Sequence, residues 1–565
     1  MLAMRFFFAC PDRVSLAARG RHRRVGRASL VFGCASLLLA GCATAGFPAL
    51  IDSHEVPGAY SAPRITRVRD IGQVRLPEQG AWQGASDGVA VPGELVLVEG
   101  DDFGRLPTVT IGGRAATVLA RTDGGGLITQ VPTGVPAGSA QVTVSQPKGR
   151  ASFPLIIKRY AIVVHDGKVF TLTIDKDGAQ TLGAPLSVPG ARAVRLSSDG
   201  STAYLLASGT SDGKAAATDR LVVLDLTAPG GPKLVGERAL THHARLLAAA
   251  SDAPILAAIG EGKVTLFLCR HADAPAPYDA VALPKELDDP RAAELSPDGK
   301  VLALLIAAGN RLGALDVSQA PALKPITTVD LLPGERLALV RDLGFSADGE
   351  TLWVVSGDNA KTLPAIQPTR LTAVRLLGND KPALGAGTAG ASATRLLSVW
   401  RTQSVPGASA PLRLAIARGQ LLASGTTIRM PPEKAAVFVS TVADAFFKLA
   451  GLQLGTPAGA HAADKLWTRP QPGMMVRADV SGGGGPLFAT SEIMSAIDLT
   501  PDAQRLLATA VRVSPAPATN SVVLDFGVTS APIWGTPTPL FLPLGTVSPS
   551  ELKPPFQLGD LRIQP

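Results

Sequence analysis

A short turn motif built on Ser, Asp and Gly, followed at once by an apolar run, recurs along the middle of this 565-residue chain. It stands at residues 198–200, 296–299 and 346–349, with weaker copies at 251–253 and 500–503. Asp caps such a turn and Gly takes a positive φ, so each copy predicts a β-hairpin. The first four aspartates are 46 to 53 residues apart, and a step near 50 residues suits one four-stranded sheet of a repeating β-protein.

A third strand follows each hairpin, as at residues 220–226, 313–317 and 370–374. The first two of these strands end in Asp-Leu and Asp-Val, and the third ends in Val. This order resembles the YVTN and lactonase-like β-propellers, well over 160–380 and less well over 380–565. Gly and Pro, 59 and 46 residues, supply the turns that many short strands need. We therefore predict an all-β chain with a β-propeller at 158–565.

Seven blades are predicted, with six or eight as alternatives. Residues 162–164 and 169–174 are typical of the inner strands of a first blade that lacks its own first strand. A strand near 557–563 would complete that blade and close the ring, which removes free sheet edges. Residues 430–434 could be a degraded turn, 437–449 could instead be a helix, and an insertion is expected around 375–430.

The first 41 residues are interpreted as an export signal, because arginines precede an apolar run of ten residues at 30–39. Leu39-Ala40-Gly41-Cys42 resembles the bacterial lipobox, which implies that Cys42 is lipidated and becomes the first mature residue. The alternative is a plain secretory signal. Seven arginines and one aspartate leave with the signal, so the net charge falls from +8 to +2. The positive net charge of the whole sequence therefore does not indicate nucleic-acid binding.

The expected location and partners follow from the predicted export signal. Ala43 follows the lipidated Cys, and by resemblance to other lipoproteins this favours an outer-membrane protein facing the periplasm or the cell surface. Only Cys42 and Cys269 remain after cleavage, which excludes an intramolecular disulfide once Cys42 is acylated. Residues 42–62 suit a tether. The expected partners are the membrane, through the lipid, and an envelope protein or glycan.

Short strands with turns about every ten residues predict a small immunoglobulin-like sandwich at 63–157. The residues Gly93 to Gly100, Val109-Thr-Ile-Gly112-Gly113, Val131-Pro132 and Ala137 to Val144 resemble an IPT/TIG domain. These residues are turn glycines and core apolar positions, so they indicate fold and no chemistry.

Several segments match the residue pattern of a catalytic or phosphate-binding motif but lack the structural context that the motif requires. Residues 209–213 spell a nucleophile elbow but lie between two predicted strands. Residues 385–390 spell a dinucleotide fingerprint without the strand and helix it needs, and the glycines at 482–485 have no following Lys-Ser/Thr pair. Asp175-Lys-Asp177-Gly178 begins like a calcium loop, but its twelfth position is Leu186. A hairpin turn is the better interpretation.

Cys269 and His271 share one face of a predicted strand, and His242-His243 lie one blade earlier. Four such groups could bind zinc, but a buried Cys and surface His are common in any fold, and we predict no metal, cofactor or catalytic residue. The predicted function is a membrane-anchored, non-catalytic binding or scaffolding module. The alternative is a lactonase-like hydrolase that acts in the central channel of the propeller.

Overall fold

The structure is a computed structural model of the chain. It describes residues 61–72, 86–165, 167–175, 178–209, 219–269, 275–306, 311–331, 340–357, 368–377, 396–409, 411–417, 420–429, 475–482, 485–490, 493–512, 520–533, 536–547 and 560–565. These residues form strands β1 to β39 and one short 3-10 helix, η1 (Lys285–Leu287). No helix among them is long and apolar enough to cross a membrane. The all-β prediction is confirmed.

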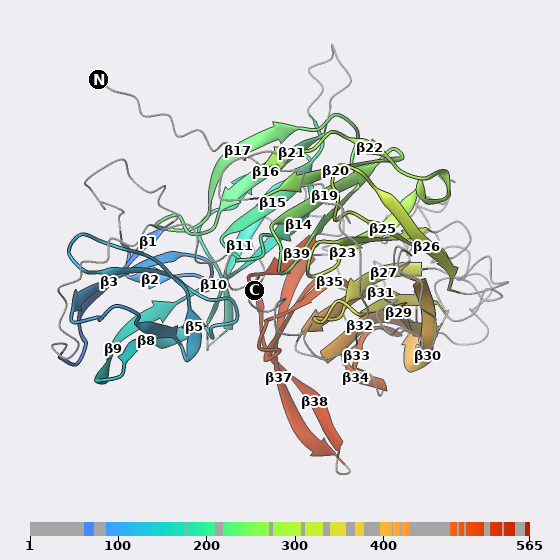
Figure 1. Cartoon of the computed structure of the whole chain (residues 1–565). Helices are drawn as coiled ribbons and strands as arrows, with labels where there is room; N and C mark the ends of the chain where they lie inside the picture. The colour runs from blue at the N-terminus through green and yellow to red at the C-terminus, as the bar shows by residue number, and fades with distance from the viewer. Residues whose placement is uncertain are drawn as a thin grey trace, which may run out of the picture. The chain divides into compact units, whose positions relative to one another are not determined.

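A sandwich of two sheets forms the first part of the described chain (Figure 1). One sheet has the order β1 (Arg64–Gly72), β3 (Leu95–Asp101), β7 (Leu127–Gln130) and β6 (Val118–Arg121). The other has the order β2 (Val89–Ala90), β9 (Gly149–Ile157), β8 (Gly138–Gln146), β4 (Thr108–Ile111) and β5 (Arg114–Ala116). Val96, Ile111 and Val142 are fully buried between the sheets, because alternate residues of a strand point to the same face.

The predicted hairpin at Gly112-Gly113 is present. Ile111 pairs with Arg114 across the turn, and both glycines have positive φ, +56° and +79°. This is the backbone twist that favours Gly in a two-residue hairpin loop. The IPT/TIG resemblance of this sandwich stays a prediction.

Among the described residues seven further sheets follow, which we call blades 1 to 7. The strands of blade 1 are named from the outermost to the innermost, and those of blades 2 to 7 from the innermost to the outermost. Blade 1 has the order β12 (Gly178–Thr181), β11 (Lys168–Asp175), β10 (Arg159–His165) and β39 (Asp560–Ile563), with β13 (Leu186–Ser187) beside β11. Blade 2 has β14 (Ala191–Leu196), β15 (Thr202–Ala207), β16 (Arg220–Asp225) and β17 (Lys233–Ala239). Blade 3 has β18 (Leu246–Ala249), β19 (Ile255–Gly260), β20 (Lys263–Leu268) and β21 (Ala276–Pro277), with β22 (Val281–Ala282) beside β20.

The remaining blades repeat the same antiparallel order. Blade 4 has β23 (Pro290–Leu295), β24 (Val301–Ile306), β25 (Arg311–Asp316) and β26 (Lys324–Asp330). Blade 5 has β27 (Val340–Phe345), β28 (Thr351–Gly357), β29 (Pro368–Leu377) and β30 (Leu396–Ser409). Blade 6 has β31 (Pro411–Ala417), β32 (Gln420–Arg429), β33 (Met475–Gly482) and β34 (Gly485–Thr490). Blade 7 has β35 (Ile493–Leu499), β36 (Arg505–Arg512), β37 (Asn520–Ile533) and β38 (Thr536–Val547).

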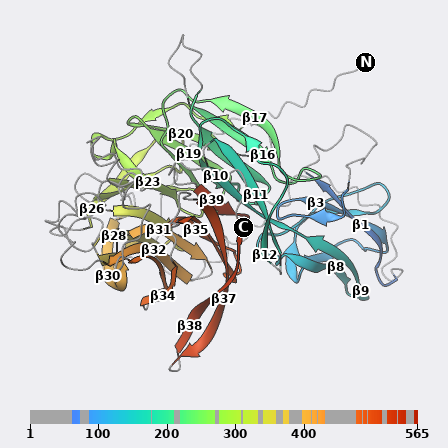
Figure 2. The ribbon, with the colours of Figure 1, turned by 180° about the vertical axis from the view of Figure 1, so that it is seen from behind.

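The inner strands close into a ring, which makes this part of the chain a β-propeller (Figures 1 and 2). In order around the ring they are β39, β14, β18, β23, β27, β31 and β35, and β35 contacts β39 again. Strands β30, β31 and β32, inside the segment predicted to hold an insertion, belong to blades 5 and 6. The predicted degraded turn at 430–434 and the alternative helix at 437–449 lie outside the described residues.

The motif turns form as predicted. Asp298 Oδ1 accepts a hydrogen bond from Ser296 Oγ at 2.7 Å and from the Lys300 N–H at 3.1 Å, and Gly299 has φ +69°. The same bonds recur around Asp199, Asp348 and Asp502. The carboxylate thus satisfies the turn's own donors and fixes where one strand ends and the next begins.

Hydrophobic packing joins each blade to its neighbour. Strands β15 and β24 are buried at every position, because both faces of a blade are covered. One cluster contains Leu305 of blade 4 and Leu352 of blade 5, and another contains Val163 of blade 1 and Leu507 of blade 7. Truncating such a leucine to alanine typically costs about 2–5 kcal/mol of stability.

The ring is closed by the last described strand, as the sequence predicted. β39 pairs with β10, with Ala161 opposite Ile563. The Gln564 side chain accepts a hydrogen bond from the Tyr160 N–H at 2.7 Å and donates one to the Gly200 carbonyl at 2.8 Å. These bonds hold β39 in blade 1 and connect it to blade 2.

Candidate functional site

The antiparallel order of the strands gives the propeller two faces. The motif turns lie on one, which we call the turn face, and the other, the loop face, carries the loops between blades and the loops between the second and third strands of each blade. The sandwich contacts the turn face, where Gln130 Nε2 donates to Asp199 Oδ2 at 3.2 Å and Gly230 N donates to Asp87 Oδ2 at 3.2 Å. The loop face takes no part in these contacts.

Six charged side chains on the inner strands form what we call the channel cluster. Its members are Arg195, Glu294, Asp342, Asp498, Asp560 and Arg562. They belong to blades 1, 2, 4, 5 and 7, yet their charges act on one another. Side chains from five blades can interact in this way only if they surround a common centre, so the cluster lines the middle of the ring.

Part of the channel cluster has a structural role in closing the ring. Asp560 Oδ2 accepts hydrogen bonds from Arg195 Nη1 and from the Val194 N–H, each at 3.0 Å. On the other side of β39, Asp498 Oδ2 accepts from the Ile563 N–H at 2.8 Å. The closing strand is therefore bonded to blade 2 and to blade 7.

Burial changes the acidity of the cluster. It raises the pKa of Glu294 to about 7, against the opposing effect of Arg195 and Arg562. Burial also raises the pKa of Asp498 and lowers that of Arg195. For Arg562 burial lowers the pKa, but the surrounding carboxylates outweigh it and the pKa is raised. Glu294 can thus exchange a proton near neutral pH.

A cavity of about 650 Å³ opens between blades 1 and 2 on the loop face. It is lined by Gly167, Lys168, Ser187, Pro189, Gly190, Ala191, Arg192 and Ser208. Blade 1 supplies the turn between β10 and β11, and the rest comes from the connection into β14 and the end of β15. The polar and charged side chains among the described lining residues are therefore those of Lys168, Ser187, Arg192 and Ser208.

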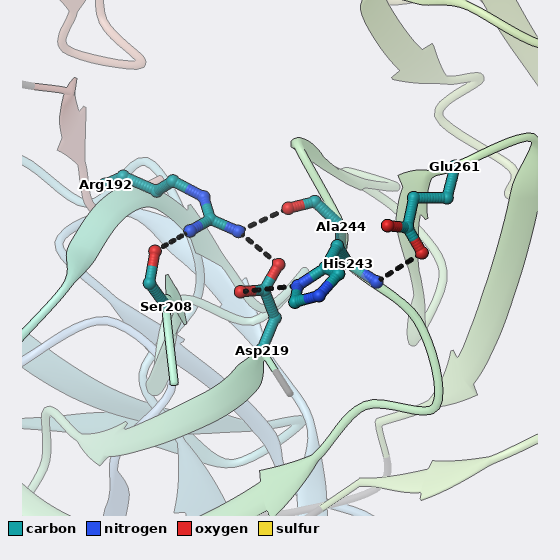
Figure 3. A network of polar contacts seen from close by, with 6 residues as sticks. All are labelled: Arg192, Ser208, Asp219, His243, Ala244 and Glu261. Atoms are coloured by element: carbon teal, nitrogen blue, oxygen red, sulfur yellow. Dashed lines mark hydrogen bonds and ion pairs between the residues drawn. The ribbon is translucent and has the colours of Figure 1, made fainter. Parts of the chain in front are cut away.

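Arg192 of the cavity is held by several polar contacts (Figure 3). Its guanidinium donates to Asp219 Oδ2 at 2.5 Å, to Ser208 Oγ and to the Ala244 carbonyl. Asp219 is 4% exposed, so its charge requires the cationic partner. The pair links two strands of blade 2 to the loop that enters blade 3.

The same carboxylate also faces a histidine. His243 Nδ1 lies 3.7 Å from Asp219 Oδ1, and the His243 N–H donates to Glu261 Oε2 at 3.2 Å (Figure 3). Glu261 has φ +49° in the turn between β19 and β20, a conformation that costs a residue with a side chain about 1–2 kcal/mol. The network thus fixes Arg192 from behind, on the side of blade 3.

The contacts of Ser208 do not suit a serine nucleophile. A serine nucleophile needs a general base within hydrogen-bond reach. The neighbour of Ser208 is instead the Arg192 guanidinium, which cannot accept a proton. His243 faces Asp219 and not a hydroxyl group. A general base for Ser208 is therefore not among these contacts.

The residues singled out by sequence motifs do not form this site. Asp175 and Gly178 make the predicted hairpin turn, with the Gly178 N–H donating to Asp175 Oδ1 at 3.0 Å. Gly482 pairs with Gly485 in the β33–β34 hairpin. Cys42, Ser211 of the nucleophile-elbow motif and residues 385–390 lie outside the described residues.

Three of the four groups considered for zinc make other contacts. Cys269 is buried beside Tyr204, and burial raises the pKa of its thiol to about 12. His242 is buried next to Thr265, His243 faces Asp219, and His271 lies outside the described residues. In the part of the chain that the structure describes, no three His, Cys, Asp or Glu side chains are placed to hold a metal.

The sequence reasoning did not find Arg192 or Asp219. They stand 27 residues apart, at the start of β14 and just before β16, and no local motif joins them. The two arginines of inner strand β14, Arg192 and Arg195, stand out among its apolar residues, but the sequence does not show which of them belongs to the cavity.

The solved structures similar to this chain include a β-propeller domain, but the similarity is too low to support an argument about this chain. No family model and no curated protein matches this chain. Three of the similar solved structures are a proposed 6-phosphogluconolactonase from Bacteroides fragilis, a periplasmic gluconolactonase from Pseudomonas aeruginosa, and a β-propeller domain of Cps50 (Swd1) from Myceliophteria thermophila. Each is 12% identical to this chain.

Coverage is extensive but structural similarity is low. The first covers 72% of this chain and 98% of its own, with a TM-score of 0.42. The second covers 72% and 99%, with a TM-score of 0.41, and the third covers 62% and 86%, with a TM-score of 0.34. The fold class therefore rests on the strand order and the closed ring of inner strands. By that criterion the protein is a β-propeller protein with a β-sandwich before the ring.

Proposed function

We propose that this protein is an envelope lipoprotein, anchored through Cys42, whose propeller acts as a non-catalytic binding module. The observation that supports it best is the cavity on the loop face, where Arg192 is oriented by three hydrogen bonds. A side chain held in its binding geometry loses little entropy when a ligand arrives.

The way the loop face is built favours a recognition role. The ring supplies a rigid frame of paired strands, and the loops between blades lie side by side on it. The sandwich contacts lie on the turn face, so they leave the cavity open. The lipid on Cys42 would hold this binding face in the cell envelope, in the outer membrane by the resemblance to other lipoproteins, with an envelope protein or glycan as the partner.

A lactonase-like hydrolase is the second candidate function, and one observation favours it. Glu294 lies in the channel cluster with a pKa of about 7, so it could act as a general base at neutral pH. Its two cationic neighbours, Arg195 and Arg562, could stabilise a developing oxyanion.

The test compares the full-length chain with two single-cysteine variants in a bacterial host. Labelled palmitate should be incorporated into the wild-type protein and into Cys269→Ala, but not into Cys42→Ala. Crosslinking in intact envelopes followed by affinity purification should recover a distinct protein or glycan with the wild type. Unlabelled wild-type protein would refute the anchor, and hydrolysis of gluconolactone that Glu294→Gln abolishes would favour the enzyme.

A further inference from the structure

We propose that the end of the sandwich at which the tether enters docks on a phospholipid bilayer, with Leu106 inserted among the headgroups. We call it the tether end, and it consists of residues 61–63 and the loops at 102–107, 122–126 and 147–148. This inference rests on the proposed lipid anchor at Cys42 and adds a second contact with the membrane. The anchor alone would hold the chain at the bilayer, whereas the docked sandwich would also fix how the chain stands on it.

The strand pairing gives the sandwich two ends. β1 begins at Arg64, opposite Asp101 at the end of β3. It ends at Gly72, opposite Leu95 at the start of β3. The nine residues of β1, at about 3.3 Å each, put its two ends roughly 26 Å apart. The loop that follows β3 therefore leaves the sandwich where β1 begins.

Two hydrogen bonds bring the other loops to that same end. Gln146, the last residue of β8, donates to the Asp102 carbonyl. Arg121, the last residue of β6, donates to the Gly104 carbonyl. The loops that follow β8 and β6 start directly after these two residues, so all three loops lie together at the tether end.

The propeller contacts the other end of the sandwich. Gln130, which bonds to Asp199 of the propeller, pairs with Leu95 at the start of β3. A Cβ on Gly93 would lie only 2.5 Å from the Asp199 carbonyl oxygen, so the two backbones meet closely there. The tether and the propeller are therefore attached to opposite ends of the sandwich.

The described part of the tether lies against the loops of the tether end. Ser61 donates a hydrogen bond to the Asp102 carboxylate, and a Cβ on Gly149 would lie 3.0 Å from the Ala62 Cβ. Ser61 stands 19 positions after Cys42, a stretch that can span at most about 70 Å. A lipid on Cys42 would therefore keep the tether end near the bilayer at a high effective concentration, so that a weak contact is enough for docking.

Leu106 is the large apolar side chain that this end presents. It is 90% exposed, against 54% for Leu119, the next of the exposed large hydrophobic residues in the described chain. The rest of its loop is held, because Phe103 is buried in the sandwich core and the Gly104 carbonyl accepts the bond from Arg121. An apolar side chain that enters the interfacial region of a bilayer leaves water, which lowers its free energy.

The charges of the three loops do not favour either sign of lipid. The loops carry Arg105 and Lys148 but also Asp102 and Asp123. Arg105 precedes Leu106, and an arginine can extend to a phosphate group while its stem lies along apolar surface. The docking therefore depends on the insertion of Leu106, and it should persist at high salt because salt screens only the charges.

Fluorescence quenching on the full-length lipoprotein tests this. A fluorophore is attached through Pro147→Cys, at an exposed position of the loop after β8. The chain is reconstituted in vesicles of phosphatidylethanolamine and phosphatidylglycerol that contain spin-labelled phospholipid. Cys269 is buried and an acylated Cys42 has no free thiol, so the fluorophore reacts at position 147. We expect quenching by the spin-labelled lipid at low and at high salt.

Two matched leucine variants distinguish docking from mere tethering. Leu106→Asp should remove at least half of the quenching, because a carboxylate resists transfer out of water, and its exposed position leaves the fold intact. Leu234→Asp is the same change on β17 of the propeller, at 51% exposure, and should be quenched like the unsubstituted chain. Absence of quenching, its loss at high salt, or equal quenching of the two variants would overturn the proposal.

Palmitate labelling separates this inference from the proposed function. If Cys42 is labelled but Leu106→Asp leaves the quenching unchanged, the docking surface fails and the anchor stands. If Cys42 is not labelled, the anchor fails, and the same fluorophore is then measured in Cys42→Ala. Quenching that Leu106→Asp reduces in that chain would keep the docking surface, and no quenching would overturn it as well.

Discussion

Glu294→Gln is expected to stabilise the propeller at alkaline pH and to have little effect in acid. Burial raises the pKa of Glu294 from its ordinary 4.5 to about 7 in the folded chain. Below pH 4.5 the carboxyl is protonated in both states and costs nothing. Between the two values the unfolded chain loses its proton first, so stability falls as the pH rises.

The size of the effect follows from the two pKa values. The gap between 4.5 and about 7 corresponds to at most about 3 kcal/mol at 1.36 kcal/mol per pH unit. Gln has nearly the same shape and no charge, and the two arginines of the channel cluster keep three carboxylates around them. Glu294→Gln should therefore gain up to about 3 kcal/mol near pH 8.5 and about 1 kcal/mol near pH 5.5.

Urea titration followed by tryptophan fluorescence, at both pH values, measures this difference. Glu286→Gln is the matched control, because Glu286 is exposed in η1, and it should not change the pH dependence. If Glu294→Gln has the same pH dependence as the wild type, or is less stable at alkaline pH, Glu294 is ionised in the folded state without cost. The account of the channel cluster given above would then be wrong.

Two further stability predictions concern the turns and the ring closure. Ala503 has φ +55° where the equivalent Gly299 has φ +69°, so Ala503→Gly should gain about 0.5–1 kcal/mol and Gly299→Ala should lose about 1–2 kcal/mol. Opposite signs in urea titrations would refute the left-handed turn. Asp560→Ala removes the partner of Arg195 and should cost about 3 kcal/mol, whereas Asp289→Ala, which breaks an exposed pair, should cost less than about 0.5 kcal/mol. Equal losses would show that the channel bond contributes nothing to closure.

The architecture was predictable because the turns between strands are determined by residues that are close together in the sequence. Each motif turn brings together residues at most five positions apart, such as Ser296, Asp298 and Val301, so the sequence shows it directly. The closing strand was predictable by elimination, since blade 1 lacked a first strand. The last strand of blade 5 and the first two strands of blade 6 were harder to predict, because residues 396–429 carry no copy of the motif.

The candidate site was not predictable for the opposite reason. Arg192 meets Ser208, Asp219 and Ala244, which lie 16, 27 and 52 residues away. No spacing rule connects those positions, because the distance along the chain depends on loop lengths that differ from blade to blade. A sequence motif that was considered as a possible phosphate site, the glycines at 482–485, forms an ordinary hairpin.

The bond between Tyr160 and Gln564 joins residues 404 positions apart. While the chain is being synthesised, the edge of β10 that pairs with β39 stays unpaired until almost all of the residues after it have been added. Such an edge is a template for pairing with other chains, and contacts this distant in sequence form slowly. Assembly in the cell should therefore depend on holding chaperones, and synthesis cut short before β39 should yield aggregates in place of a smaller propeller.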